Sequence, residues 1–217
     1  MKILSIIFLA IFLFFISANG EEIVRKSRAG LSAGMGVCYL NAPDIVALVN
    51  ATAGTREADF KAAVEFFGAG SLPFSQDWSL KLEYTYLLGG YTVPGPFGGS
   101  EFTIALHMPT LIVQYILAEE VIYNVKGGAG LGYHFGDLRT KGALLGDASY
   151  NGKGLGALLE FEANTAFGED LFGFLALEMR WDFVGNVKDE ANRSPGPNEV
   201  ALNFFGIGAK FGFSYYF

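Results

Sequence analysis

The stretch that decides the fold is the last part of the chain, residues 205–217, which reads FGIGAKFGFSYYF. Every second side chain in it is apolar, namely Phe205, Ile207, Ala209, Phe211, Phe213, Tyr215 and Phe217. The positions between them carry mostly Gly, Lys and Ser. Because successive side chains of a β-strand point to opposite faces, this pattern predicts a strand with one wholly apolar face.

The same alternation recurs in seven earlier segments, 31–39, 60–74, 78–88, 101–117, 121–135, 155–167 and 171–183. Segment 101–117 changes phase at Pro109, so we expect a β-bulge there. Before that bulge, the expected outward side chains are Phe102, Ile104, Leu106 and Met108. Each segment is long enough to cross a bilayer as a tilted strand, which takes about 10 residues.

The links between these eight strands alternate in length. Three are short, at 75–77, 118–120 and 168–170, and four are long, at 41–59, 94–100, 138–154 and 188–199. This alternation around an even number of strands is typical of bacterial outer-membrane barrels. The expected fold is therefore all-β: an eight-stranded antiparallel up-and-down transmembrane β-barrel. Pro43 and the apolar residues at 45, 46, 48 and 49 predict a short helix in the first long loop.

The amino-acid composition argues against several classes of protein for this chain. Charged residues make up 17% of the 217 residues, whereas about 25% is usual in soluble domains. Aromatic residues reach 15%, which excludes intrinsic disorder. The formal charge of −7 argues against a nucleic-acid partner, because phosphate binding needs a basic surface.

The N-terminus has the pattern of a secretory signal peptide. Lys2 precedes an apolar run from Ile3 to Ile16, and Ala18 and Gly20 are small residues at the expected cleavage site. We therefore expect residues 1–20 to be a signal peptide and 21–217 to be the barrel domain. The alternative is a membrane anchor, but a run of 14 residues is shorter than the about 20 needed to span a bilayer.

The two faces of the strands differ in a way that indicates which one is inside. The apolar face carries large side chains, and the other carries glycines and charges, as expected for a lipid-facing outside and a crowded lumen. The charge network expected in the lumen comprises Lys61, Glu65, Lys81, Glu83, Lys126, Glu160, Glu162, Glu178, Arg180, Asp182 and Lys210. These near-balanced charges predict a polar lumen plugged by paired side chains. The alternative is a soluble lipocalin-like barrel with the apolar face inside.

At this level the chain resembles the small outer-membrane barrels of the OmpA-transmembrane, OmpX and OmpW type, over about residues 29–217. Its most specific motif is the C-terminal strand, in which Phe211, Phe213, Tyr215 and Phe217 resemble the signal read by the barrel assembly machinery. The resemblance implies a bacterial outer-membrane location, with lipid and the assembly machinery as partners. It also suggests a non-enzymatic structural or surface-binding protein; the alternative is a narrow, OmpW-like channel for small apolar molecules.

Few residues suggest other chemistry. His134 and His107 are the only histidines, and a third hypothesis is a lipid-modifying enzyme that uses one of them with a Ser and an acid. One Cys and two distant His match no metal-ligand spacing, so we expect no metal and no cofactor. The glycines of 127–132 lack the strand–turn–helix context of a phosphate loop, and Cys38 is expected to be a small interior residue.

Overall fold

The structure, a computed structural model, describes residues 28–53, 62–93, 99–142 and 146–217. The predicted signal peptide and Lys61 lie outside the described residues. Eight strands and one helix follow in the order β1 (Gly30–Asn41), α2 (Pro43–Ala53), β2 (Ala63–Pro73), β3 (Trp78–Val93), β4 (Ser100–Glu119), β5 (Tyr123–Gly142), β6 (Ala148–Ala166), β7 (Leu171–Asn186) and β8 (Ala201–Tyr216). The helix lies where the sequence predicts it.

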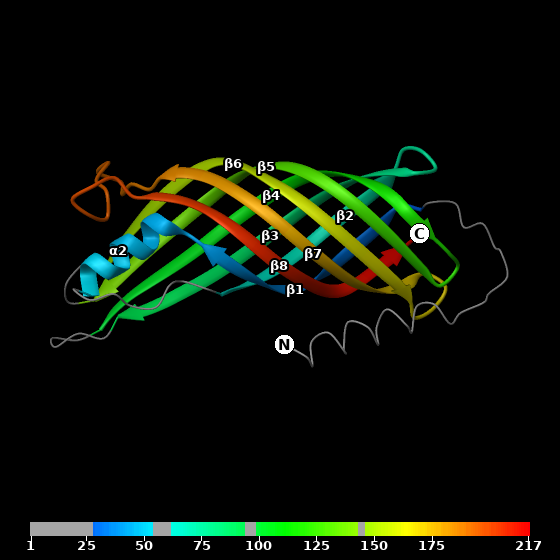
Figure 1. Cartoon of the computed structure of the whole chain (residues 1–217), viewed down its shortest axis with the longest axis horizontal. Helices are drawn as coiled ribbons and strands as arrows, with labels where there is room; N and C mark the ends of the chain where they lie inside the picture. Colours follow the sequence, from blue (N-terminus) through cyan, green and yellow to red (C-terminus); the bar gives the residue numbers. More distant parts are fainter. Residues whose placement is uncertain (1–27, 54–61, 94–98, 143–145) are drawn as a thin grey trace.

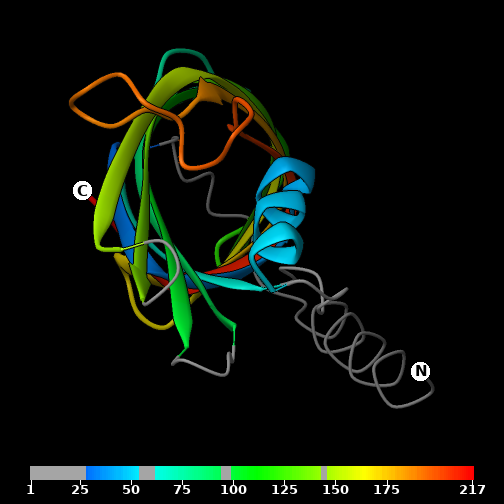
Figure 2. The same cartoon turned by 90° about the vertical axis from the view of Figure 1, so that its left-hand side faces the viewer.

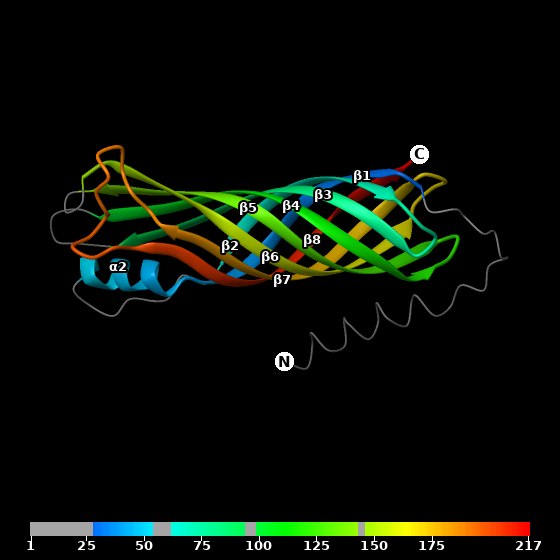
Figure 3. The ribbon, with the colours of Figure 1, turned by 90° about the horizontal axis from the view of Figure 1, so that it is seen from above.

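The strands form a closed barrel in which each pairs antiparallel with the next, and β8 pairs with β1 (Figure 1). Closure leaves each strand with a partner on both sides over most of its length. The expected eight-stranded up-and-down barrel is confirmed. The tight turns gather at one end, where β8 also ends, and α2 and the described link 187–200 between β7 and β8 lie at the other (Figure 3). We call these the short-turn end and the long-loop end.

The outward face is a band of apolar side chains. Aliphatic residues such as Leu82, Leu131 and Leu159 are exposed in its middle. Aromatic pairs flank them: Trp78 and Tyr115 meet edge to face toward the short-turn end, with ring centroids 5.0 Å apart, and Trp181 lies 5.6 Å from Phe205 toward the other end. Aromatic girdles around an aliphatic band are typical of outer-membrane barrels.

The interior has two layers. Toward the short-turn end and the middle, the buried side chains are mostly charged or polar; toward the long-loop end they are aliphatic and aromatic. The second layer corrects the expectation of a lumen that is polar throughout. It includes Phe102, Ile104, Leu106 and Met108, all of which are buried and point inward.

The predicted phase change at Pro109 is wrong. The pairing of β4 with β5 keeps one register from His107↔Phe135 to Thr110↔Gly132, so the chain passes Pro109 without an extra residue. The even-numbered side chains therefore face inward along β4, from Phe102 through Ile112 to Gln114. The register shift in this pair of strands lies between Ile116 and Ala118, at the short-turn end.

The hairpin of β5 and β6 is longer than predicted. Both strands continue into the expected loop 138–154 and leave only residues 143–147 as the link. On this extension the outward side chains are polar, as at Arg139 and Asn151. The apolar outward face that marks the rest of these strands therefore ends there, while buried Leu138 and Tyr150 point inward.

The hairpin of β1 and β2 is short by comparison. Ladder pairing of β1 with β8 stops at Asn41↔Phe205, and that of β2 with β3 starts at Val64↔Leu88. Both β8 and β3 continue beyond these pairs toward the long-loop end. Helix α2 contacts β8 and β3 at this level and lies at the rim of the ring of strands (Figure 2).

Candidate functional site in the lumen

Two lysines form the centre of a buried ion-pair network. The Lys81 ammonium lies 2.8 Å from Glu160, 3.0 Å from Glu162 and 3.1 Å from Glu83. Lys210 lies 2.5 Å from Glu83 and 2.6 Å from Glu178. Glu83 therefore connects the two lysines, and the network joins strands β3, β6, β7 and β8 across the lumen.

Further donors complete the network. The Arg180 guanidinium lies 2.8 Å from Glu178 and 3.7 Å from Glu65. Gln114 donates to both Glu160, at 3.0 Å, and Glu162, at 2.8 Å. Glu83, Glu160, Glu162 and Glu178 each lie beside at least two charged or amide donors, which compensate these buried carboxylates in the absence of bulk water. Both carboxylate oxygens of Glu65, in contrast, have no hydrogen-bond partner among the described residues.

Ten of the eleven residues expected in the lumen network lie in the described part of the chain, and all ten are buried. They comprise six acids, Glu65, Glu83, Glu160, Glu162, Glu178 and Asp182, and four bases, Lys81, Lys126, Arg180 and Lys210. Lys61 lies outside the described residues. Asp182 lies apart from the lysines and contacts His134 instead.

Thr110, His134 and Asp182 form a hydrogen-bonded chain across three strands. His134 Nδ1 bonds to the Asp182 carboxylate, and His134 Nε2 lies 3.1 Å from the Thr110 hydroxyl. Gly132 and Gly156 make room for the imidazole, since a Cβ at either position would overlap with the ring. The sequence places His134 near the end of its strand, but the longer β5 places it well inside the barrel.

The hydrogen-bonded series Asp182, His134 and Thr110 has the acid–imidazole–hydroxyl order of a catalytic triad. However, all three side chains are almost fully buried, with Thr110 only 4% exposed. A nucleophile must be reached by its substrate, and these side chains are packed between the charged layer and the apolar layer. In this geometry the three residues hold β4, β5 and β7 together.

The other histidine faces away from the lumen. Tyr84 Oη lies 2.5 Å from Nδ1 of His107, and the ring of Tyr86 packs against the imidazole with centroids 4.8 Å apart. All three side chains belong to the outward band on β3 and β4. The two histidines therefore lie on opposite sides of the barrel wall and cannot act together.

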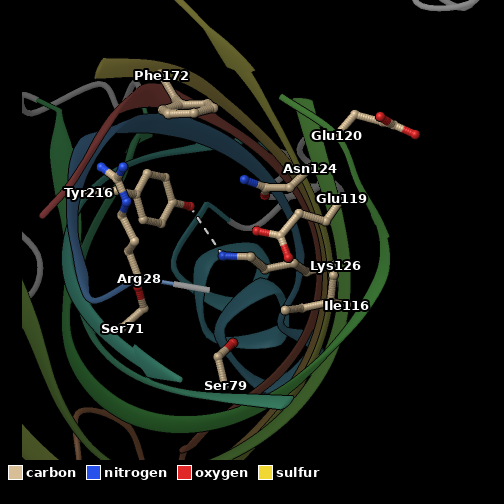
Figure 4. A pocket seen from close by; sticks show the side chains of 10 residues that line it. All are labelled: Arg28, Ser71, Ser79, Ile116, Glu119, Glu120, Asn124, Lys126, Phe172 and Tyr216. Carbon is tan, nitrogen blue, oxygen red and sulfur yellow. Dashed lines mark hydrogen bonds between the residues drawn. The ribbon is translucent and has the colours of Figure 1, made fainter. Parts of the chain in front are cut away.

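A small recess lies at the short-turn end of the lumen. Its lining includes Arg28, Glu119, Asn124 and Phe172, and Lys126 donates to the Tyr216 hydroxyl at 3.1 Å across it (Figure 4). The recess has a volume of about 30 Å³, enough for one or two water molecules. Lys126 also lies 3.6 Å from Glu162, so the recess leads directly onto the ion-pair network.

Neither a metal centre nor a spanning helix is found in the described residues. Among them, no group of three or more His, Cys, Asp or Glu side chains is arranged to hold a metal ion. Within the same part of the chain, no helix is both long and apolar enough to cross a membrane, a finding that does not concern strands. The free thiol of Cys38 is buried in the lumen wall.

No protein-family model matches the chain, and no curated protein sequence matches it. Solved structures do resemble it. Neisserial surface protein A superimposes with a TM-score of 0.56 at 12% identity, covering 88% of this chain and 98% of that one. A major outer membrane protein from Thermus thermophilus gives 0.53 at 13% identity, with 88% and 100% covered. Ail, the attachment invasion locus protein of Yersinia pestis, gives 0.50 at 10% identity, with 89% and 100% covered.

Identities this low show the fold alone. The chain has the fold of the small outer-membrane β-barrel proteins, and the resemblance inferred from the C-terminal strand and the alternating segments is confirmed at that level.

Proposed function

We propose that the protein is an integral β-barrel of a bacterial outer membrane that is not an enzyme and acts as a structural or surface-binding protein. The observation that carries this proposal is the outward apolar band with its aromatic girdles, which in water would be a very large exposed apolar surface. The named proteins of similar fold are outer-membrane, surface or attachment proteins. One of them was crystallised with a heparin analogue, which supports surface binding as a role for a barrel of this kind.

The lumen is proposed to be closed to ions. Support comes from the network that Lys81 and Lys210 form with four glutamates across the middle of the lumen. The apolar layer between this network and the long-loop end also supports it. An eight-stranded barrel is just wide enough for its own side chains to fill. Planar bilayers test this: the purified protein should give negligible conductance, and a reproducible large conductance would exclude a closed lumen.

Membrane insertion itself is tested by gel migration. A folded outer-membrane barrel resists detergent until it is boiled, so the extracted protein should migrate differently before and after heating.

We further propose that residues 1–20 are removed on export. Mass spectrometry of the mature protein should then give a chain that starts at Glu21.

The alternative function, a narrow route for small apolar molecules, is favoured by one observation. The long-loop half of the lumen is lined by apolar side chains such as Leu87, Leu106 and Leu202 rather than by charges.

The enzymatic hypothesis would need the Thr110 hydroxyl to be reached by lipid. Expression of the protein and of a Thr110→Ala variant should therefore leave the lipid A and phospholipid profiles of the host unchanged.

A further inference from the structure

A groove with a polar lining lies on the outer face of the barrel wall, at the end of the apolar band on β4, β5 and β6. Its lining includes His107, Phe135, Asp137, Asn151 and Lys153, and its volume is about 440 Å³, within the range of ligand pockets, about 300–1,000 Å³. The backbone pairs His107↔Phe135 and Phe135↔Lys153 place three of these side chains in one row across neighbouring strands (Figure 1). We call this depression the polar groove.

Lys153 gives the polar groove a positive charge. The carboxylate of Asp137, the acidic side chain in the lining, accepts hydrogen bonds from the Ser149 hydroxyl, at 2.6 Å, and from the Arg139 guanidinium, at 3.0 Å. Lys153 is exposed and forms no hydrogen bond or ion pair with another described residue. The polar groove therefore presents an unpaired ammonium group to the outside of the barrel.

His107 supplies a second donor on the other side of Phe135. When the Tyr84 hydroxyl donates to Nδ1 of His107, at 2.5 Å, the neutral imidazole carries its proton on Nε2. This atom has no partner among the described residues. Lys153 and His107 are two strand spacings apart, about 10 Å between backbones. A phosphate group, which a lysine binds as a point charge, has several acceptor oxygens and can lie between these two donors.

A second groove, with an apolar lining, follows on the same wall toward the short-turn end. The short side chains of Ala129 and Ala157 lie in it among the longer Leu111, Leu131 and Trp181, and its volume is about 660 Å³. Ladder pairs join Leu111 to Leu131, Leu131 to Ala157, and Ala157 to Trp181. The row therefore runs without a break across four strands, and we call this depression the apolar groove.

The two grooves follow one another in the order of the parts of a lipid. Leu131 precedes Phe135 by four residues on β5, and Ala157 follows Lys153 by four residues on β6, which separates the two rows by about 13 Å along the strands. In a membrane, aromatic side chains at the end of the apolar band lie at the level of the headgroups. The apolar groove then faces acyl chains, and the polar groove faces headgroups.

We infer that the two grooves together bind one anionic membrane lipid, with its phosphate between Lys153 and His107 in the polar groove and an acyl chain in the apolar groove. This inference rests on the proposed insertion in a membrane, because the lipid comes from the leaflet at the long-loop end. It gives the outer face of the barrel a specific ligand, in addition to its general contact with lipid.

The test uses the full mature protein with Trp78→Phe, so that Trp181 in the apolar groove is the one remaining tryptophan. The protein is inserted in phosphatidylcholine vesicles that contain a small fraction of either phosphatidic acid or phosphatidylcholine with brominated acyl chains. Quenching of Trp181 gives the relative affinity for the two lipids. Phosphatidic acid should bind about fivefold more tightly, the ratio that about 1 kcal/mol from one lysine produces. Equal affinities would overturn the inference.

Substitutions of lysine test where the phosphate binds. Lys153→Met should lower the affinity ratio of the two lipids to about one, whereas Lys153→Arg should retain the preference for phosphatidic acid. Lys141→Met is the matched control, because Lys141 is also exposed at the long-loop end of β5 but does not line the polar groove. It should leave the preference unchanged. A preference that survives Lys153→Met, or that Lys141→Met lowers as much, would contradict the site.

Two further measurements locate the site and identify its occupant. Trp181→Phe leaves Trp78 on β3, toward the short-turn end, and Trp78 should show no preference; an equal preference there would mean that the attraction is not local to the grooves. Excess inorganic phosphate at constant ionic strength should leave the preference at Trp181 unchanged, because the acyl chain holds the lipid. Loss of the preference would identify a free anion as the occupant and overturn the lipid.

Failure of the proposed function gives a different result. If neither brominated lipid quenches either tryptophan, the apolar band does not face lipid, and membrane insertion and the lipid site are both wrong. If both tryptophans are quenched, but without a preference at Trp181, the barrel is inserted and the lipid site alone is wrong.

Discussion

The Lys81 ammonium on β3 lies 2.8 Å from the Glu160 carboxylate on β6, on a strand that is not its neighbour in the barrel. This ion pair spans the lumen, and both side chains are buried. It connects two walls that no backbone hydrogen bond joins. The network around it therefore links the sides of the barrel as well as filling its interior.

The first prediction concerns this ion pair. Lys81→Met leaves three buried glutamates without their shared cation, and breaking a buried ion pair typically costs about 3–5 kcal/mol. Urea unfolding of the barrel in vesicles, followed by Trp fluorescence, should show a destabilisation of that order. Lys153→Met on the exposed side of β6 is the control, with an effect below about 0.5 kcal/mol. Equal effects of the two substitutions would show that the network does not hold the walls together.

A second prediction concerns the space around His134. Gly156→Ala places a methyl group where the imidazole lies, and overpacking of this kind costs about 1–3 kcal/mol. Gly68→Ala is the matched control, because no heavy atom lies within 4 Å of the added Cβ. If His134→Ala restores the stability lost in Gly156→Ala, the ring is the source of the strain. An unchanged free energy of unfolding for Gly156→Ala would contradict the geometry of this site.

Much of this architecture can be predicted from the alternation of apolar and polar side chains along the sequence, but two features cannot. The inward direction of Phe102, Ile104 and Leu106 was predicted wrongly because apolarity alone cannot assign a face when one layer of the lumen is also apolar. The polar residues Thr110 and Gln114 farther along β4 would have indicated the inward face, because they have even numbers like Phe102, Ile104 and Leu106 and point inward on the same side of the strand.

The chain of Thr110, His134 and Asp182 is the other feature. It depends on the register of three strands, β4, β5 and β7, and no spacing along the sequence encodes that register.

A third prediction concerns pH and the loop between β7 and β8. Asp189 accepts hydrogen bonds from the backbone and side chain of Arg193, which hold the pKa of its carboxyl below the ordinary value. Because the folded pKa is lowered, these bonds stabilise the loop above the ordinary pKa of Asp, about 3.9, and are lost as the pH falls through the lower folded value. The amide NMR shift of Arg193 should follow this titration, and Asp189→Asn should remove it. A shift that is flat with pH in the native protein would refute the assignment.

A fourth prediction concerns the C-terminus. The Phe217 amide donates to the Ala29 carbonyl at 3.0 Å beside β1, and its ring is exposed with the outward band. Deletion of Phe217 should lower the amount of assembled barrel in the outer membrane, because the predicted assembly signal loses its last aromatic residue. The deletion should leave refolding of the purified chain in detergent largely intact, which separates assembly from stability. Normal amounts of assembled barrel after the deletion would show that Phe217 is not part of such a signal.

The most direct test of the central claim uses the two tryptophans, Trp78 and Trp181, which belong to the outward band toward opposite ends of the barrel. In vesicles that contain brominated phospholipids, single-Trp variants should each lose most of their fluorescence, while aqueous iodide quenches little. Strong quenching by iodide, with none by the brominated lipid, would mean that the apolar band does not face lipid and would contradict the whole account.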